Sequence, residues 1–221
     1  MKHVLEIDSV QLQLNNRKIL SGIYLKCETG QITGLLGKNG EGKSSLMKIM
    51  YGSLPCEKSV RFDHMSVLKT FKRPDLLVYL PQFNFIPGSL SLRRVFHDFE
   101  LAYSTFEDRF PEFTGREKLT VGSLSGGERR LVEVYLIVKA PSQFAMLDEP
   151  FTQLNPLQIE KVKELLTQEK ANKGFLITDH MYRHILDLSD RLFLVKDGKT
   201  IFIRDMQHLV LHGYVRVREQ L

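Results

Sequence analysis

Residues 32–50 read ITGLLGKNGEGKSSLMKIM. An apolar run typical of a buried strand leads into a glycine-rich turn, and a helix-like segment follows. The turn, Gly37 to Ser44, matches the pattern GxxxxGK[ST]. Its glycines allow a tight turn in which several N–H groups point inward, and the dipole of the following helix also favours anions. The stretch therefore predicts a binding site for the phosphates of a nucleoside triphosphate.

The side chains of this loop have separate expected roles. Lys43 is placed to reach the β and γ phosphates. The Ser44 hydroxyl is placed to bind Mg²⁺, which keeps several of its waters and needs few protein ligands. We expect the Glu41 side chain to point away into solvent. The loop residues expected to bind the nucleotide are Gly37, Asn39, Gly40, Gly42, Lys43, Ser44 and Ser45.

Two carboxylates end a second apolar run. Residues 144–149 read FAMLDE, so a buried strand would deliver Asp148 and Glu149 to its C-terminal end, where parallel sheets bind ligands. Asp148 is placed to orient Mg²⁺, directly or through water, and Glu149 to polarise the attacking water. The alternative is that both carboxylates only cap a helix. A third apolar run, residues 174–178, leads to His180, which either contacts the γ-phosphate or is an ordinary surface residue.

Between the loop and the carboxylates, residues 124–128 read LSGGE. Ser125, followed three residues later by Glu128, predicts a capping box at the start of a helix. A capping box does not explain two consecutive glycines in the first turn, each of which costs roughly 1 kcal/mol relative to alanine. Glycines there favour close approach of a ligand to exposed N–H groups. We therefore expect a second phosphate-binding surface at this helix start.

With these motifs in place, the chain resembles the ATPase subunit of ABC transporters, from about Leu5 to Gly198. Any one motif can arise by chance, whereas five in the family's order do not plausibly do so. The five are the loop GKNGEGKS, the Q-loop glutamine Gln82 in YLPQ, the signature LSGGE, the strand FAMLDE and the switch histidine His180.

The resemblance implies an α/β fold of the P-loop NTPase, ABC ATPase type. We expect a mostly parallel sheet core with an antiparallel β subdomain, both within residues 1–82 and 141–221, and a small helical subdomain within residues 83–140. It also implies a head-to-tail homodimer, or a pair with a related cassette subunit, that sandwiches two ATP molecules. Ser125 and Gly127 would serve the partner's nucleotide, Gln82 would sense Mg²⁺ and the γ-phosphate, and His180 would hold the γ-phosphate near the attacking water.

The resemblance further implies a transmembrane permease as partner, moved by ATP-driven closure of the dimer. Two rival functions remain open. One is a soluble, non-transport ABC ATPase, although such relatives usually carry a second cassette or a long coiled coil. The other is a nucleotide-dependent switch with weak hydrolysis, against which Glu149 and His180 argue.

Two positions depart from the family pattern. Alignment places Leu14 where an aromatic residue usually stacks on adenine, so we expect weaker contact with the base. Asn155 stands where the D-loop normally has Asp, which keeps hydrogen-bonding capacity but loses the charge. We expect this second departure to affect communication between the two ATP sites more than hydrolysis.

Composition limits the other possibilities. The 221 residues carry a net charge of +5, but basic and acidic residues are mixed, and the densest basic group, Lys69 to Arg73, is short, so nucleic-acid binding is not supported. No run approaches the ~20 apolar residues of a membrane span, and the N-terminus lacks a signal core. We expect a cytoplasmic protein, peripheral to the membrane through its permease. Cys27 and Cys56 are interpreted as structural.

Aromatic residues are concentrated between Phe83 and Phe113. Six apolar positions in alternating steps of four and three predict one striped helix before Pro111, either as the core of the helical subdomain or as part of a groove for a permease helix. In the groove interpretation, a charge at Phe85 or Phe96 would uncouple ATPase activity from transport. The six are Leu92, Phe96, Phe99, Tyr103, Phe106 and Phe110.

Overall fold

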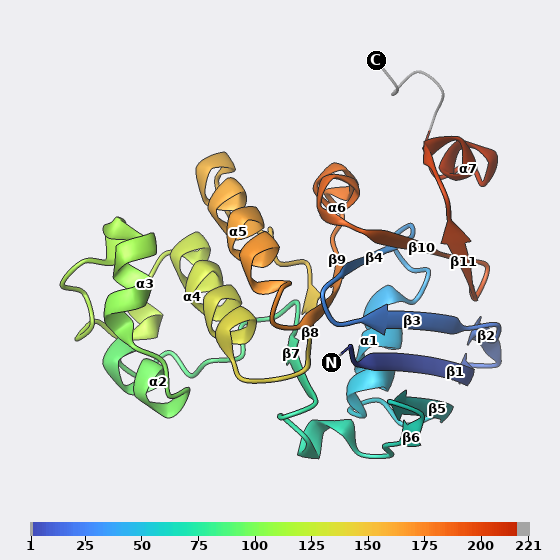
Figure 1. Cartoon of the computed structure of the whole chain (residues 1–221), viewed down its shortest axis with the longest axis horizontal. Coiled ribbons are helices and arrows are strands. Elements are labelled where there is room, and N and C mark those ends of the chain that lie inside the picture. Colours follow the sequence, from blue (N-terminus) through green and yellow to red (C-terminus); the bar gives the residue numbers. More distant parts are fainter. Residues whose placement is uncertain (1, 216–221) are drawn as a thin grey trace.

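A six-stranded sheet forms the centre of the chain in the computed structural model, which describes residues 2–215 (Figure 1). Its strand order is β11-β10-β4-β9-β8-β7, and every pairing is parallel except that of β10 with β11. Each residue of β4, β8 and β9 is buried, as expected of strands covered on both faces. The bounds are β4 Ile32–Leu36, β7 Leu77–Leu80, β8 Phe144–Asp148, β9 Gly174–Thr178, β10 Arg191–Lys196 and β11 Lys199–Ile203.

A second, antiparallel sheet lies at the opposite end of the molecule from helices α2 and α3 (Figure 1). Its long strand β1 pairs with β2, β3 and β5, and β5 pairs with the short β6. The two sheets together confirm the predicted fold class, a mostly parallel core with an antiparallel β part. The bounds are β1 Val4–Leu14, β2 Arg17–Leu20, β3 Tyr24–Glu28, β5 Glu57–Phe62 and β6 Met65–Ser66.

The two faces of the central sheet pack against different partners. In β8, Phe144 and Met146 join a core with α1 and the antiparallel sheet, whereas Ala145 and Leu147 join a core with α4, α5 and α6. This alternation follows from the two-residue period of a strand. Both faces are therefore sealed, and the loops at the strand ends remain for a site. The bounds are α1 Lys43–Tyr51, α4 Gly126–Lys139, α5 Pro156–Glu169, α6 Tyr182–Leu188 and α7 Met206–Leu211.

The aromatic stripe lies on two helices, so the prediction of one helix was wrong. Helices α2 (Leu92–Asp98) and α3 (Tyr103–Arg109) are separated by a turn in which Glu100 has a left-handed φ of 56°. The spacing continues across the break because both helices pack on the same aromatic cluster. Phe106 lies at its centre, with ring centroids 4.9 Å from both Phe96 and Tyr135.

The interpretation of the stripe as a core is confirmed. Four of its residues are fully buried, and Phe99 and Tyr103 pack against them. The short 3₁₀ turns η2 (Pro111–Phe113) and η3 (Val121–Ser123) contribute Phe113 and Val121 to this core, whereas the turn η1 (Thr70–Lys72) packs near α1 and β7. The buried four are Leu92, Phe96, Phe106 and Phe110. The division into core residues 1–82 and 141–221 and helical residues 83–140 stays a prediction.

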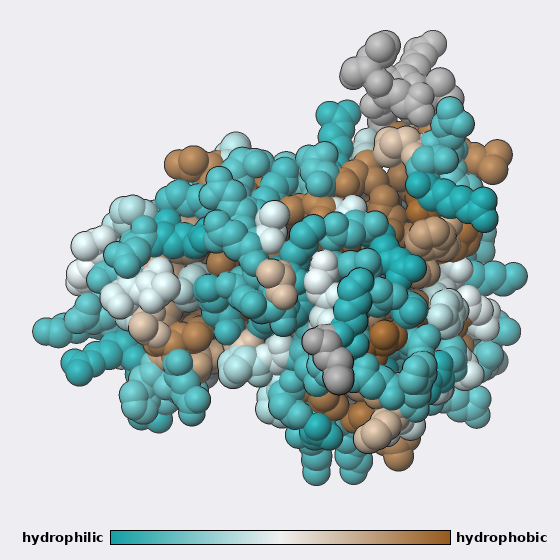
Figure 2. All heavy atoms as spheres, in the orientation of Figure 1, coloured by the Kyte–Doolittle hydropathy of each residue, from teal (hydrophilic) through white to brown (hydrophobic). Residues whose placement is uncertain are grey.

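Within residues 2–215, no helix has the length and apolar character that crossing a membrane requires. The face seen in Figure 2 is mostly hydrophilic, and apolar atoms gather on it mainly near α6 and α7.

Candidate nucleotide site

The phosphate loop joins β4 to α1 and leaves the start of that helix open. Gly42 occupies the N-cap position with a left-handed φ of 94°, a conformation that favours glycine, and no side chain caps the helix. The N–H groups of Lys43, Ser44 and Ser45 therefore lack an intrahelical acceptor. Together with the helix dipole, they form an anion site of the kind that the sequence predicts.

A cavity of about 410 Å³ lies at this helix start, within the size range of small-molecule sites. Gly37 does not line it, but its carbonyl oxygen accepts a hydrogen bond of 2.7 Å from Lys43 Nζ. Burial lowers the pKa of Lys43, and the nearby carboxylates, Glu149 first, act in the opposite direction. The cavity is lined by Ile19, Asn39, Gly40, Gly42, Lys43, Ser44, Ser45, Gln82 and Glu149.

Asp148 lies at the end of β8 beside the loop, and its side chain is held by two hydroxyls. Ser44 Oγ donates to Asp148 Oδ1 at 3.2 Å, and Tyr79 Oη donates to Asp148 Oδ2 at 3.1 Å. Burial raises the pKa of Asp148, and these two hydrogen bonds oppose the rise. Tyr79 was not predicted as a site residue, although its position on β7, three residues before Gln82, is a usable signal.

The oxygen donors at this position fit Mg²⁺. A hydroxyl and a carboxylate meet at 3.2 Å, and the Gln82 side chain lines the same cavity. Among residues 2–215 there is no cluster of three or more His, Cys, Asp or Glu residues suited to a metal. A hard cation that takes one or two carboxylates, keeps its waters and binds through phosphates matches such a donor set.

Glu149 follows Asp148 in a strained backbone conformation. Its φ is 53°, which is uncommon for a residue with a side chain and which clusters at functional sites. Its N–H donates to the Thr178 carbonyl at 2.7 Å, which places the residue between β8 and β9. His180 Nδ1 lies 3.4 Å from Glu149 Oε2, and the His180 side chain is 49% exposed. The two predicted catalytic side chains are therefore neighbours, although only Glu149 lines the cavity.

The signature residues lie elsewhere. Ser125 and Gly127 are not among the cavity-lining residues. The predicted capping box is confirmed: Glu128 N–H donates to Ser125 Oγ at 3.3 Å, and Ser125 N–H donates to Glu128 Oε2 at 2.8 Å. The second glycine is pressed against the loop after β8, because a Cβ atom on Gly127 would lie 2.6 Å from the carbonyl oxygen of Gln153.

The structure adds detail at three further positions, and the expected effects of Asn155 and Leu14 on the ATP sites stay predictions. Glu41 is partly exposed and does not line the cavity, but it is not free in solvent: its Oε2 accepts a hydrogen bond of 3.0 Å from Asp197 N–H, which ties the phosphate loop to the β10–β11 turn. Asn155 caps α5 in a second capping box, with Gln158, so its amide oxygen has a structural use. Leu14 ends β1, but its side chain lies outside the described residues; Ile19 is the apolar residue that lines the cavity.

The groove interpretation is wrong for Phe96. That ring is 1% exposed and lies in the aromatic core, so a charge there would disrupt folding rather than a surface. Phe85 is half-buried against Phe99, with ring centroids 6.5 Å apart. Phe83, which is 64% exposed, is the aromatic residue of this segment that presents a surface.

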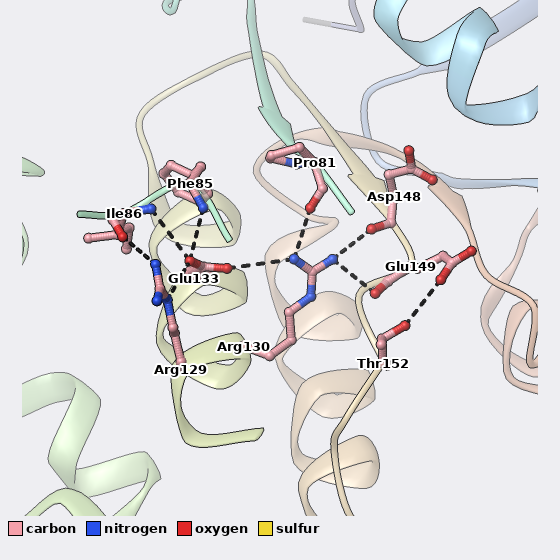
Figure 3. A network of polar contacts seen from close by, with 9 residues as sticks. All are labelled: Pro81, Phe85, Ile86, Arg129, Arg130, Glu133, Asp148, Glu149 and Thr152. Atoms are coloured by element: carbon pink, nitrogen blue, oxygen red, sulfur yellow. Dashed lines mark hydrogen bonds and ion pairs between the residues drawn. The ribbon is translucent and has the colours of Figure 1, made fainter. Parts of the chain in front are cut away.

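Sequence reasoning missed a buried polar network behind the site (Figure 3). Arg130, from α4, donates to the main-chain carbonyl groups of Pro81, Asp148 and Glu149. Asp179 is also buried, and its carboxylate accepts hydrogen bonds from the N–H groups of Phe151 and Met181. The available signal was two adjacent arginines, residues 129 and 130, next to a run (residues 131–138) that is apolar except for the glutamate at 133.

Comparison with known proteins gives consistent matches. The family model described as "ABC transporter" matches residues 20–152. The lipopolysaccharide export system ATP-binding protein LptB of Escherichia coli K12 is 31% identical over 218 residues, covering 89% of this chain and 85% of that protein. LptB of Acidithiobacillus ferridurans is 29% identical, covering 98% and 96%. A solved structure of the ATP-binding subunit of an ABC transporter has the same fold, with a TM-score of 0.81 at 19% identity, covering 96% of this chain and 94% of that one.

Proposed function

Because this chain belongs to the ABC transporter family of ATP-hydrolysing subunits, we propose that it closes head to tail with a second cassette over two molecules of Mg-ATP. The second cassette is another copy of this chain or a related subunit. The energy of ATP binding and hydrolysis drives a transmembrane partner, and the cassette is peripheral to the cytoplasmic face of the membrane. The LptB relatives make the permease of an export system the first class of partner to look for.

ATP binding is assigned to the loop and the first turn of α1. The N–H groups of this turn donate to phosphate oxygens, and Lys43 exchanges the carbonyl groups of Gly37 and Lys38 for the β and γ phosphates. Ser44, Asp148 and Gln82 would hold Mg²⁺, which supplies charge neutralisation on the phosphates. The aliphatic Ile19 offers the base a packing surface without aromatic stacking.

Hydrolysis is assigned to Glu149, which lines the cavity and accepts a hydrogen bond from Thr152 Oγ1 at 3.3 Å. Its carboxylate orients and polarises the attacking water, because phosphoryl transfer depends mainly on positioning and on charge stabilisation. His180, 3.4 Å from that carboxylate, holds the γ-phosphate near the water. The partner's Ser125 and Gly127, at the start of its own α4, complete each site.

The observation that carries this proposal is the meeting of the phosphate loop, Gln82 and Glu149 around one cavity. Glu149→Gln tests it. The variant keeps the shape of the side chain but loses the base, so it should bind Mg-ATP normally, accumulate as an ATP-bound dimer in light scattering, and lower kcat by roughly 100-fold or more.

Glu57→Gln, a change of an exposed residue at the start of β5, is the matched control and should leave kcat unchanged. Full ATPase activity in Glu149→Gln would remove Glu149 from the catalytic role. A variant that binds Mg-ATP but stays monomeric at every protein concentration would contradict the head-to-tail dimer.

A further inference from the structure

We propose that Arg130 is a positioning residue that fixes the main chain of Glu149 and ties it to the loop carrying Gln82. The inference rests on the proposed function, in which Glu149 orients water and Gln82 contacts the metal and the γ-phosphate. It adds a residue of the signature helix that touches neither nucleotide nor metal. Figure 3 shows its guanidinium between the two loops.

The contacts of Arg130 join three segments that are far apart in the sequence. Nη1 donates to the Pro81 carbonyl at 2.9 Å, and Nη2 donates to the carbonyls of Asp148 and Glu149 at 2.6 and 2.9 Å. Pro81 is the residue immediately before Gln82. The planar guanidinium holds its donors in a fixed fork, so a shift of one carbonyl changes the geometry of the others.

Glu133 continues the connection toward the far side of the Gln82 loop. Its carboxylate is fully buried, its Oε2 lies 3.7 Å from Arg130 Nη1, and its Oε1 accepts hydrogen bonds from Phe85 N–H at 3.1 Å and Ile86 N–H at 3.5 Å. The main chain is thus held before Gln82 by Arg130 and after it by Glu133. The loop is clamped to α4 at both ends.

Burying this network lowers the stability of the fold. Arg130 is 2% exposed and Glu133 is 0% exposed, and burial of an ion pair often costs more than the attraction returns. Arg130 Nε and Glu133 Oε2 have no hydrogen-bond partner within the part of the chain that the structure describes. Burial lowers the pKa of Arg130 and raises that of Glu133, in keeping with this cost. A well-packed apolar pair would serve stability better, so positioning is the better explanation.

The held segment is also the strained one. Glu149 has a φ of 53°, and such a conformation persists only where its surroundings fix it. Arg130 binds the carbonyl of that residue, Thr178 accepts from its N–H, and Thr152 binds its carboxylate. Removing the guanidinium releases one of three restraints on the candidate base, and a misplacement of about 1 Å can lower turnover by roughly 100-fold.

Arg129 provides a matched control on the same helix. It donates to the Ile86 carbonyl and, at 3.4 Å, to Glu133 Oε1, so its hydrogen bonds lie on the Gln82 side of the network (Figure 3). Arg129→Met removes a charge of the same kind from the neighbouring position. It loosens only the Gln82 side of the network and should lower kcat by several-fold at most, whereas Arg130→Met should lower kcat roughly 10- to 100-fold.

The test separates positioning from stability. Arg130→Met leaves Glu133 without its buried partner, so the double variant Arg130→Met/Glu133→Gln should recover thermal stability but not kcat. Arg130→Lys should remain impaired, because one ammonium group cannot reproduce the fork. In every variant the Kd for Mg-ATP should stay within about threefold, because Lys43 and its loop are untouched. If kcat recovers together with stability, or if Arg129→Met is as damaging as Arg130→Met, the inference is overturned.

A double-mutant cycle tests the tie to the Gln82 loop. If Arg130 and Gln82 act on the same arrangement, the two substitutions are not independent. The kcat of the double variant Gln82→Ala/Arg130→Met should then be several-fold higher than the two single losses multiplied together would give. If the two losses simply multiply, Arg130 does not act through the Gln82 loop. The wild type and Glu149→Gln are measured in parallel: normal kcat in Arg130→Met while Glu149→Gln is inactive would reject this inference alone, and activity in both would reject the proposed function.

Discussion

Two helices of this protein begin beside glycine, and their first turns are built in opposite ways. Helix α1 follows the left-handed Gly42 and has no side-chain cap, whereas α4 follows Ser125 and has a complete capping box. The start of α1 opens on the cavity, while at the start of α4 the carbonyl oxygen of Gln153 packs closely against the Cα of Gly127.

The difference indicates two kinds of anion site. At α1 the three open N–H groups can bind a ligand, because none of residues 2–215 accepts a hydrogen bond from them. At α4 the capping box uses the N–H groups of Ser125 and Glu128, so those of Gly126 and Gly127 are left for a ligand. The first site is formed within one chain. In the proposed dimer, the second site would bind the nucleotide of the partner molecule.

The largest expected effect concerns the α1 site. Lys43→Ala removes the cation that would bind the phosphates, and a hydrogen bond to a charged group contributes about 1.5–3 kcal/mol. We expect the Kd for Mg-ATP to rise roughly 100-fold in calorimetry. Lys38→Ala removes an exposed lysine from the same loop and should change the Kd little. Equal binding by Lys43→Ala and the wild type would contradict the assignment of this loop.

The next effect concerns the α4 start. In Gly127→Ala the new Cβ would lie 2.6 Å from a main-chain oxygen, which cannot move cheaply, and overpacking of this kind costs about 1–3 kcal/mol. We expect roughly 10-fold lower ATPase activity while the Kd for Mg-ATP, measured on the monomer, stays unchanged. A parallel loss of monomer binding would show that the two helix starts are not independent.

Gly126→Ala is the matched control. Its Cβ would meet the side-chain oxygen of Gln153 at 2.5 Å, and that exposed side chain can swing away. Combining it with Gln153→Ala should remove any remaining defect, whereas Gln153→Ala should not rescue Gly127→Ala. Rescue of both would mean that the Gln153 side chain, not its main chain, sets the position of α4.

The other end of α4 offers a test by pH. Lys173 Nζ donates to the Ala140 carbonyl at the C-cap, and burial lowers the pKa of this lysine to about 8. The unfolded chain, with a pKa near 10.5, therefore binds more protons between these values, so this residue's contribution to the free energy of unfolding rises from pH 8 to pH 10.5.

Lys173→Met abolishes that contribution. In urea titrations the wild type should gain about 2 kcal/mol relative to Lys173→Met as the pH rises from 8 to 10.5. Taking the difference between the two proteins cancels the titration of Cys27 and the tyrosines, whose raised pKa values act in the opposite direction. A pH-independent difference would show that Lys173 is solvated in the folded protein.

Local sequence patterns were sufficient for both helix starts and for the strands beside them. Gly42 before a helix and Ser125 three residues before Glu128 encode their conformations within one turn, and the apolar runs of β4, β8 and β9 encode burial. The break between α2 and α3 could not be predicted in this way. A helical period continues across a turn when both helices face one core.

Contacts between distant segments could not be predicted either. Arg130 donates to three carbonyl groups in two distant segments of the chain. In the sequence alone, a charged residue at this position indicates the exposed face of an amphipathic helix. The approach of Gln153 to Gly127 likewise depends on how the loop after β8 packs on α4. For this reason the sequence accounts for the glycines of the signature only by a ligand, whereas the structure adds a packing cause at Gly127.

The smallest expected effect returns to the caps themselves. Ser125→Ala deletes the N-cap oxygen of α4, which should lower the free energy of unfolding by about 1 kcal/mol. Ser45→Ala, in the first turn of the uncapped α1, should change it by less than about 0.5 kcal/mol, since no cap is lost there. Adding saturating Mg-ATP to the monomers should reverse the contrast: the ligand stabilises through α1, so Ser45→Ala should gain less from Mg-ATP than Ser125→Ala does. If the two substitutions change the free energy of unfolding equally, both with and without Mg-ATP, the two helix starts do not differ as described.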